Sequence, residues 1–281
     1  GEHQDCLDEQ IAAAFKPTPA NTLRGVYQQM LIMALSNPFH LAEGAAFELF
    51  GALAPVANLG RLLAWDNEDE SDGPVVDLCE SQPCLAVDQK PESPSEHLRR
   101  LELGALLVAL HEPAPLQTAI QRQLLEQVRP HWLGRLQRRH ERTDTNGSCN
   151  LVMGLARIHN RLLGHSTEQS SAQMLDSSAG GTCLLCNGDQ GSELSVGQLL
   201  LLLGGNGTST LAMVRWRHLN AEGLHLGLRY LKGLPRPAWL RRAPGAQTHP
   251  GVLQSTPDTG SVWHHGLWLP AGQFGEGENL W

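Results

Sequence analysis

The first part of the chain repeats apolar residues at the spacing of amphipathic helices. From Asn21 onward they recur at steps of three and four residues, which is typical of a helix with one buried face. Asn37-Pro38 ends this pattern, because the residue before a proline disfavours the helical conformation. A second helix is predicted from Ala42 to Leu53, before Pro55.

Two more helices are predicted before residue 131. The segment from Ser95 to His111 begins with a residue that can cap a helix and carries an apolar stripe. The segment from Pro115 to Val128 predicts the fourth helix, and Pro130 marks its end. Between the second and third helices, two short strand-like pieces, Pro74 to Leu78 and Cys84 to Val87, lie in an acidic loop.

Beyond residue 131 the pattern changes to short apolar runs separated by Gly, Asn and Asp. Such runs at regular spacing are typical of a β-barrel. The predicted strands are Cys149 to Met153, Gly181 to Leu185, Gln198 to Leu203, Ser209 to Trp216 and His225 to Leu231. A short helix is predicted at residues 155–163, where apolar residues return to helical spacing. After Leu234 the pattern supports only a strand-like piece near Trp263 to Leu269.

These elements predict an α+β fold with two domains and an extension. Residues 1–130 form a mainly helical domain that contains the acidic loop. Residues 131–240 form an antiparallel β-barrel that begins with an arginine-rich linker, and residues 241–281 form a C-terminal extension that the pattern does not assign.

The charge of the chain is concentrated in one segment. The formal net charge of the 281 residues is −8, and residues 66–96 hold ten acids against the single base Lys90. Residues 129–142 instead hold five arginines against Glu141. This distribution favours a compact anion over a long nucleic acid, so no DNA or RNA partner is expected. An RNA-binding barrel is disfavoured further because aromatic residues make up only 5% and the strands lack a stacking pair.

The cysteines do not indicate a disulfide scaffold or a metal site. Six cysteines are too few for a scaffold at this length, and no signal peptide is visible, so a cytoplasmic location is the default expectation. No apolar run reaches about 18 residues, so no membrane span is expected. Cys183 and Cys186 form a CxxC motif within an apolar strand, and no second pair at zinc spacing accompanies it. Packing is therefore the favoured role, and no metal or cofactor is expected.

The motifs of common enzyme classes are also missing from the sequence. We find no G-x-S-x-G, P-loop or helix with paired carboxylates, and we therefore do not expect an enzyme.

An arginine cluster at the start of the second domain contains two RxxxR frames. Arg135 pairs with Arg139, and Arg138 pairs with Arg142. A guanidinium can bind phosphate oxygens, bind the O6 and N7 edge of guanine, or stack on a purine. Taken alone, the cluster is more often a solvated basic end of a helix.

A second motif follows, where the chain reads DSSAGG immediately before an apolar strand. Asp176, Ser178 and Gly181 match the pattern D/N-x-S-x-x-G, with Gly180 inside it. The acid and hydroxyl can bind a base edge, and the glycines allow close backbone approach. Taken alone, this segment is an ordinary turn that leads into a strand.

Together the two motifs resemble the signature of PilZ domains. The resemblance extends from about Arg135 to Lys232, since LSVGQLLLLL, LAMVRWRHLNAEG and LHLGLRYLKG look like the later strands of that family. It implies a barrel whose outer surface binds cyclic di-GMP. The implied ligand residues are one of the two arginine pairs together with Asp176, Ser178, Gly180 and Gly181.

The resemblance further implies a receptor that passes the signal to an unidentified protein effector in motility, pili, biofilm or secretion control. Whether the chain forms a homo-oligomer stays open. The alternative is a degenerate PilZ-like adaptor that binds no nucleotide. Two departures from a plain barrel motivate it: an irregular TDTNGS before the first strand and the helical segment at 155–163.

Overall fold

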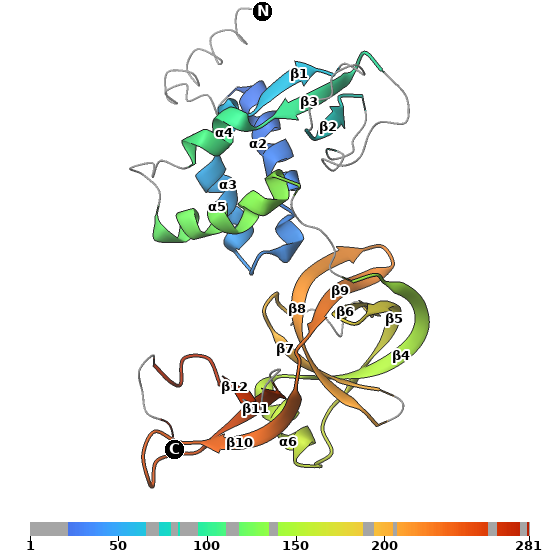
Figure 1. Cartoon of the computed structure of the whole chain (residues 1–281), viewed down its shortest axis with the longest axis vertical. Coiled ribbons are helices and arrows are strands. Elements are labelled where there is room, and N and C mark those ends of the chain that lie inside the picture. Colours follow the sequence, from blue (N-terminus) through green and yellow to red (C-terminus); the bar gives the residue numbers. More distant parts are fainter. Residues whose placement is uncertain are drawn as a thin grey trace, which may run out of the picture. The chain divides into compact units, whose positions relative to one another are not determined.

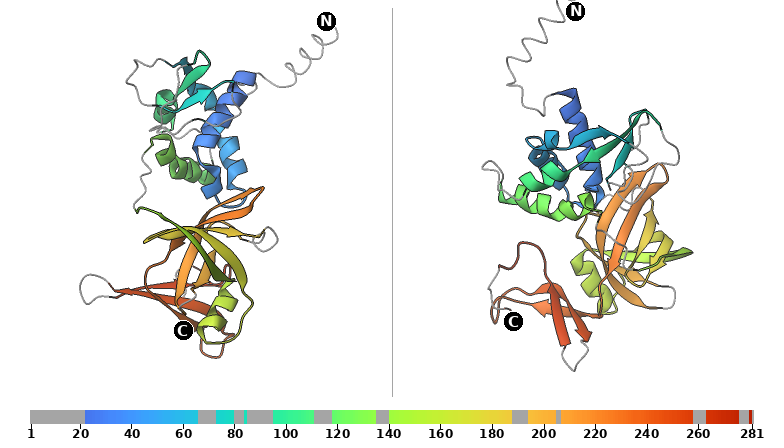
Figure 2. Two further views of the ribbon diagram at one scale, coloured as in Figure 1. Left: turned by 90° about the vertical axis from the view of Figure 1, so that its right-hand side faces the viewer. Right: turned by 45° about the horizontal axis from the view of Figure 1, so that its top comes forward.

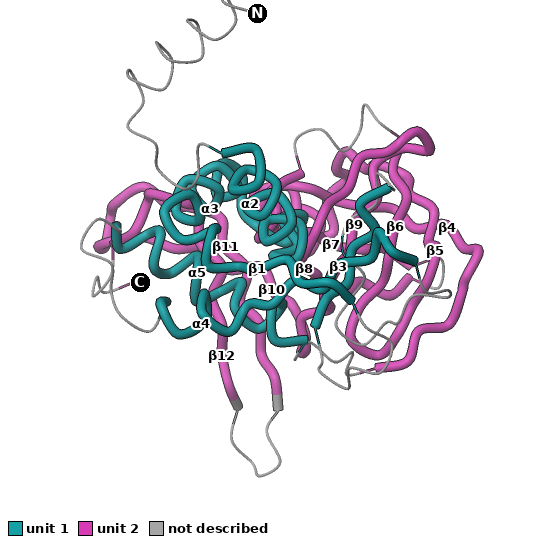
Figure 3. The backbone as a smooth tube through the Cα atoms, turned by 90° about the horizontal axis from the view of Figure 1, so that it is seen from above, with its two compact units in different colours: residues 1–137 teal, residues 138–281 magenta. Residues whose placement is uncertain are grey.

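The chain divides into two compact units, residues 1–137 and residues 138–281 (Figure 3). The computed structural model describes residues 22–65, 73–79, 84, 95–110, 118–134, 140–187, 194–204, 207–257, 263–275 and 280. Most of the predicted acidic loop and its second strand-like piece lie outside these ranges, as do Arg135, Arg138 and Arg139.

The first two predicted helices are confirmed. α2 spans Leu23–Leu35, and the Thr22 hydroxyl caps it by accepting from the Gly25 N–H at 2.9 Å. A 3₁₀ turn, η2 (Pro38–His40), follows where Asn37-Pro38 predicts the end, and α3 spans Ala45–Leu53. A second 3₁₀ turn, η3 (Ala57–Leu59), leads into the first strand.

The fourth predicted helix is present as α5 (Ala119–Trp132), but Pro130 does not end it. A capping box between Thr118 and Gln121 fixes its start. The helix continues past the proline because Trp132 is buried and its indole N–H donates to the Ser36 hydroxyl at 2.9 Å. Tertiary packing of the last turn therefore outweighs the one helical hydrogen bond that proline removes.

The segment predicted as a third helix is half strand. β3 (Leu98–Glu102) lies between β1 (Arg61–Ala64) and β2 (Val75–Asp77) in a three-stranded antiparallel sheet, and α4 spans only Gly104–Ala109. β2 confirms the first strand-like piece of the acidic region. The prediction of a mainly helical domain is therefore too simple, because unit 1 also contains this sheet.

Unit 1 encloses one apolar core. Side chains from α2, α3, α4 and α5 meet those of β2 and β3 there, including Ile32, Leu49 and Leu101. Leu98 and Leu101 are spaced like helix positions, but both are buried by the sheet. Their spacing could therefore not distinguish the two structures.

Unit 2 is built on a closed six-stranded antiparallel barrel with the strand order β4-β5-β6-β9-β8-β7 (Figure 1). The strands are β4 (Thr143–Met153), β5 (Ser170–Ser178), β6 (Gly181–Cys186), β7 (Leu199–Leu203), β8 (Ser209–Asn220) and β9 (Gly223–Tyr230). All five strands predicted for this region are present, and the fold is α+β with a closed barrel. The prediction omitted β5, because SSAQMLDSS is too polar to give a strand pattern.

Both departures from a plain barrel have a structural explanation. The TDTNGS segment does not precede β4 but forms its first part, and the register shifts between Asp144 and Gly147. The short helix is confirmed as α6 (Leu155–Leu162). It packs with Val152, Leu201 and Val252 in a small core of its own.

The predicted extension, residues 241–281, supplies two of the three strands of a further antiparallel sheet, and the end of the predicted barrel domain supplies the third. Figure 2 shows this sheet beside the barrel and α6. It consists of β10 (Leu234–Leu240), β11 (His249–Pro257) and β12 (Trp263–Trp268), and β12 confirms the strand-like piece predicted there. Pro235 and Pro237 fit because β10 is an edge strand that pairs only with β11 in this sheet. Val252 and Trp268 join the core around α6, so the sheet belongs to the barrel unit.

Within the described ranges, no helix is long and apolar enough to cross a membrane.

Candidate ligand-binding surface at the β5–β6 hairpin

The predicted motif DSSAGG forms the tight hairpin between β5 and β6. The Ser178 hydroxyl accepts from the Gly180 N–H at 3.3 Å and donates to the Gly181 carbonyl at 3.2 Å. Ser178 and Gly181 face each other as the last pair of the two strands. The serine therefore fixes the turn, which is the structural role that its sequence context also allows.

Both glycines of the hairpin have close neighbours, and the neighbour of Gly181 is backbone. A Cβ on Gly181 would lie 2.0 Å from the Leu228 carbonyl oxygen of β9, and a Cβ on Gly180 would lie 2.7 Å from Cδ2 of His140. The β9 backbone thus approaches Gly181 as closely as only glycine permits, whereas the exposed His140 ring at Gly180 can move. His140 is a neighbour of the motif that the sequence did not identify.

Asp176 holds the arginine motif and the hairpin together. Its Oδ2 accepts from Nη1 of Arg142 at 2.7 Å, and its Oδ1 accepts from the Cys183 backbone N–H at 3.0 Å. The side chains of Arg142 and Asp176 are 30% and 21% exposed, so ligand can reach this ion pair from solvent. The β5–β6 register shifts between Met174 and Asp176, and such irregularities often re-aim a side chain.

The two RxxxR frames differ in what the structure describes. Arg142 directly precedes β4 and contacts the D-x-S-x-x-G motif, so one arginine of the Arg138 and Arg142 frame is placed at the hairpin. Arg135, Arg138 and Arg139 lie outside the described residues, and the frame stays a prediction.

The outer face of the barrel continues this surface across two more strands. In register, Asp176 pairs with Cys183, Cys183 pairs with Gly227, and Gly227 pairs with Trp216. A Cβ on Gly227 would lie 1.9 Å from Nε1 of Trp216, so the indole lies against the glycine backbone. An aromatic ring thus belongs to the same row of the sheet as the ion pair.

Two residues of β9 complete the surroundings of the hairpin. The Tyr230 N–H donates to the Gly180 carbonyl at 3.0 Å, and the hydroxyls of Tyr230 and Ser177 are 3.4 Å apart. The exposed Arg229 pairs with Gly181 in register and adds a second described cation beside the motif. The sequence signal for Arg229 is its place in LGLRY. Side chains alternate between the two faces of a strand, so a residue next to the apolar Leu228 points outward.

The thiol behind the ion pair is kept protonated. Burial raises the pKa of Cys183, the Asp176 carboxylate raises it further, and the Arg142 guanidinium lowers it. A neutral buried thiol is a poor nucleophile, which argues against covalent chemistry at this position. Burial also raises the pKa of Cys186, to about 11.

The CxxC motif does not form a pair on one face. Cys186 packs in the barrel interior, whereas Cys183 lies beside Asp176 on the other face of β6, because residues three apart on a strand point in opposite directions. In the described ranges, no group of three or more His, Cys, Asp or Glu side chains is arranged to hold a metal ion.

No family model matches this chain, and no curated protein matches it either. The resemblance to PilZ domains therefore rests on the motif residues and the strand pattern.

Proposed function

We propose that the outer face of the barrel at the β5–β6 hairpin binds cyclic di-GMP, and that the chain is a receptor that passes this signal to a protein effector. The observation that carries the proposal is the contact between the two motifs. Arg142 and Asp176 are far apart in sequence, yet their side chains are 2.7 Å apart on the barrel surface.

The chemistry of the surface suits a dinucleotide. Arg142 and Arg229 are cations that can bind phosphate oxygens or a guanine edge, and Asp176 can accept from the N–H groups of guanine. Trp216 offers an aromatic ring on the same face.

One observation favours the second candidate, a PilZ-like adaptor that binds no nucleotide. Both Asp176 carboxylate oxygens and the Ser178 hydroxyl already have protein partners. In the adaptor these contacts are permanent, because no ligand replaces them. In the receptor, the Arg142 to Asp176 ion pair is exchanged for ligand contacts, which costs little because a partly exposed ion pair contributes about 1 kcal/mol or less.

Isothermal titration with cyclic di-GMP tests the proposal. We expect saturable binding to the native chain and a loss of about tenfold or more in affinity for Arg142→Ala, because a charge-assisted contact contributes about 1.5 to 3 kcal/mol. The matched control is Arg157→Ala, which removes another surface ion pair of unit 2, to Glu168 at 3.2 Å. Native affinity in the control, with loss in Arg142→Ala, supports the receptor.

Heat that never appears with the native chain would instead support the adaptor. If binding occurs, Arg138→Ala and Arg139→Ala fix the arginine frame. Loss with Arg138→Ala selects the frame that ends at Arg142, and loss with Arg139→Ala alone selects the frame that begins at Arg135.

A further inference from the structure

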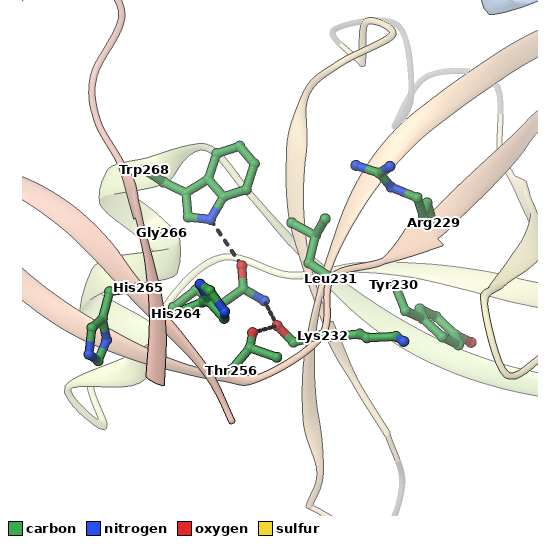
Figure 4. A pocket seen from close by; sticks show the side chains of 10 residues that line it. Arg229, Tyr230, Leu231, Lys232, Thr256, His264, His265, Gly266 and Trp268 are labelled. Atoms are coloured by element: carbon green, nitrogen blue, oxygen red, sulfur yellow. Dashed lines mark hydrogen bonds between the residues drawn. The ribbon is translucent and has the colours of Figure 1, made fainter. Parts of the chain in front are cut away.

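A cavity of about 530 Å³ lies within unit 2, where the chain leaves β9 and meets the C-terminal sheet (Figure 4). One wall is the segment Arg229 to Lys232, and the other comes from β11 and β12, including Gln254, Thr256 and Trp268. This size is within the range of small-molecule sites. Arg142 and Asp176 do not line the cavity.

Hydrogen bonds hold the walls of the cavity in place. The Lys232 carbonyl accepts from Nε2 of Gln254 at 2.8 Å and from the Thr256 hydroxyl at 2.8 Å. The Trp268 indole N–H donates to Oε1 of the same Gln254 at 3.1 Å, as the dashed lines in Figure 4 show. Gln254 is buried and uses both ends of its amide, so it fixes the Lys232 backbone and the Trp268 ring relative to each other.

The turn after Lys232 is equally constrained. Gly233 has a φ of +104°, and a Cβ there would lie 2.3 Å from the Ser255 carbonyl oxygen. No other residue fits this conformation without moving β11. The lysine is thus anchored at its backbone while its side chain is exposed, and Figure 4 shows that side chain running toward Tyr230.

The charge and shape of the lining indicate a class of ligand. Arg229 and Lys232 are cations, His264 and His265 also line the cavity, and none of the described lining residues is acidic. Tyr230 and Trp268 add two aromatic rings. A phosphate group matches the cations, and a planar ring matches the aromatic side chains.

We propose that this cavity is a binding site for a small phosphate-bearing molecule with an aromatic ring, of the size of a nucleoside monophosphate. Lys232 binds the phosphate as a point charge, and Trp268, held by Gln254, contacts the ring. The fixed walls reduce the ordering cost of binding. The site adjoins the hairpin surface, because Arg229 and Tyr230 belong to both, but Arg142 and Asp176 do not line it and it needs no cyclic di-GMP.

Isothermal titration of the full chain with 5′-AMP tests this site, with adenosine and inorganic phosphate titrated separately. We expect 5′-AMP to bind one per chain, more tightly than inorganic phosphate, and adenosine to give no saturable heat. Lys232→Ala weakens 5′-AMP binding by about tenfold, as expected for one charge-assisted contact. The matched control is Arg236→Ala, which removes an exposed cation from β10 that does not line the cavity.

Arg142→Ala separates this proposal from the proposed function. We expect it to leave 5′-AMP binding unchanged while it weakens cyclic di-GMP binding. The cavity proposal is overturned if 5′-AMP gives no heat up to about 1 mM, the weak end of measurable small-molecule binding. It is overturned equally if Lys232→Ala binds 5′-AMP like the native chain, if Arg142→Ala loses it, or if adenosine binds as tightly.

Discussion

The hairpin surface and the cavity beside β11 and β12 use their polar groups in different ways. At the hairpin, the groups that could meet a ligand are paired with each other: Arg142 with Asp176, and Ser178 with its own turn. In the cavity, the buried amide of Gln254 supports the wall, while Lys232 extends from that wall as an exposed cation. The hairpin must therefore exchange protein contacts for ligand contacts, whereas the cavity keeps its hydrogen bonds when it is occupied.

This difference predicts that the two places respond differently to substitution. Replacing Gly181 at the hairpin disturbs the barrel itself. Removing the Gln254 amide disturbs the cavity and the C-terminal sheet. Removing the partly exposed ion pair of Arg142 and Asp176 changes binding with little change in stability.

The largest effect on stability is expected from Gly181→Ala. Its new Cβ would lie 2.0 Å from the Leu228 carbonyl oxygen, so β6 and β9 must move apart. We expect a loss of about 3 kcal/mol in the free energy of unfolding, measured by urea denaturation. Gly147→Ala on β4 is the control, because no atom lies within 4 Å of a Cβ there, and its change should stay within about 0.5 kcal/mol. Equal effects of the two substitutions would refute the close approach.

Gln254→Ala should destabilise unit 2 by about 2 kcal/mol, since it leaves a gap and removes the acceptor of the Trp268 indole N–H. It should also weaken 5′-AMP binding and leave cyclic di-GMP binding intact. Gln173→Ala provides the comparison, because that amide donates to the exposed side chain of Asn146, at 3.0 Å. Urea denaturation and titration of both variants measure these effects. Unchanged 5′-AMP affinity in Gln254→Ala would mean that the Gln254 amide does not support the binding site.

Arg142→Ala should cost less than about 1 kcal/mol in the free energy of unfolding, because its ion pair is partly exposed. The same variant loses cyclic di-GMP affinity. Thermal denaturation beside the titration measures both. A large loss of stability would mean that the ion pair is a structural element of the barrel, as in the adaptor.

The smallest expected effect is on the Cys183 thiol. Asp176→Asn should lower its pKa, because the carboxylate raises it, and Arg142→Ala should raise its pKa, because the guanidinium lowers it. The rate of alkylation by iodoacetamide as a function of pH, followed at the Cys183 peptide by mass spectrometry, measures both shifts. Shifts of the opposite sign would contradict the arrangement of the three side chains.

The sequence predicted the barrel better than unit 1 because the barrel strands are apolar runs bounded by turn residues. β7, with five leucines, is clear from sequence alone, whereas β5 is polar and becomes a strand only through pairing with β4 and β6. In unit 1, Leu98 and Leu101 matched a helix, but strand partners on both sides placed them in β3. Such partners are distant in sequence, so a local pattern cannot contain them.

The two candidate sites differ in the same respect. The hairpin residues are contiguous, so a short motif could identify Asp176, Ser178, Gly180 and Gly181. Arg229 and His140 reach the hairpin through tertiary structure and were missed. The cavity joins the end of β9 to β11 and β12, and no spacing along the chain relates Lys232 to Trp268.

The most direct test of the hairpin surface is to follow backbone amides by two-dimensional NMR while cyclic di-GMP is added to saturation. The account predicts that the amide signals of Asp176, Gly180 and Gly181 shift in the native chain and stay in place in Arg142→Ala. Signals at the hairpin that do not move at saturation, or shifts confined to β10, β11 and β12, would contradict it.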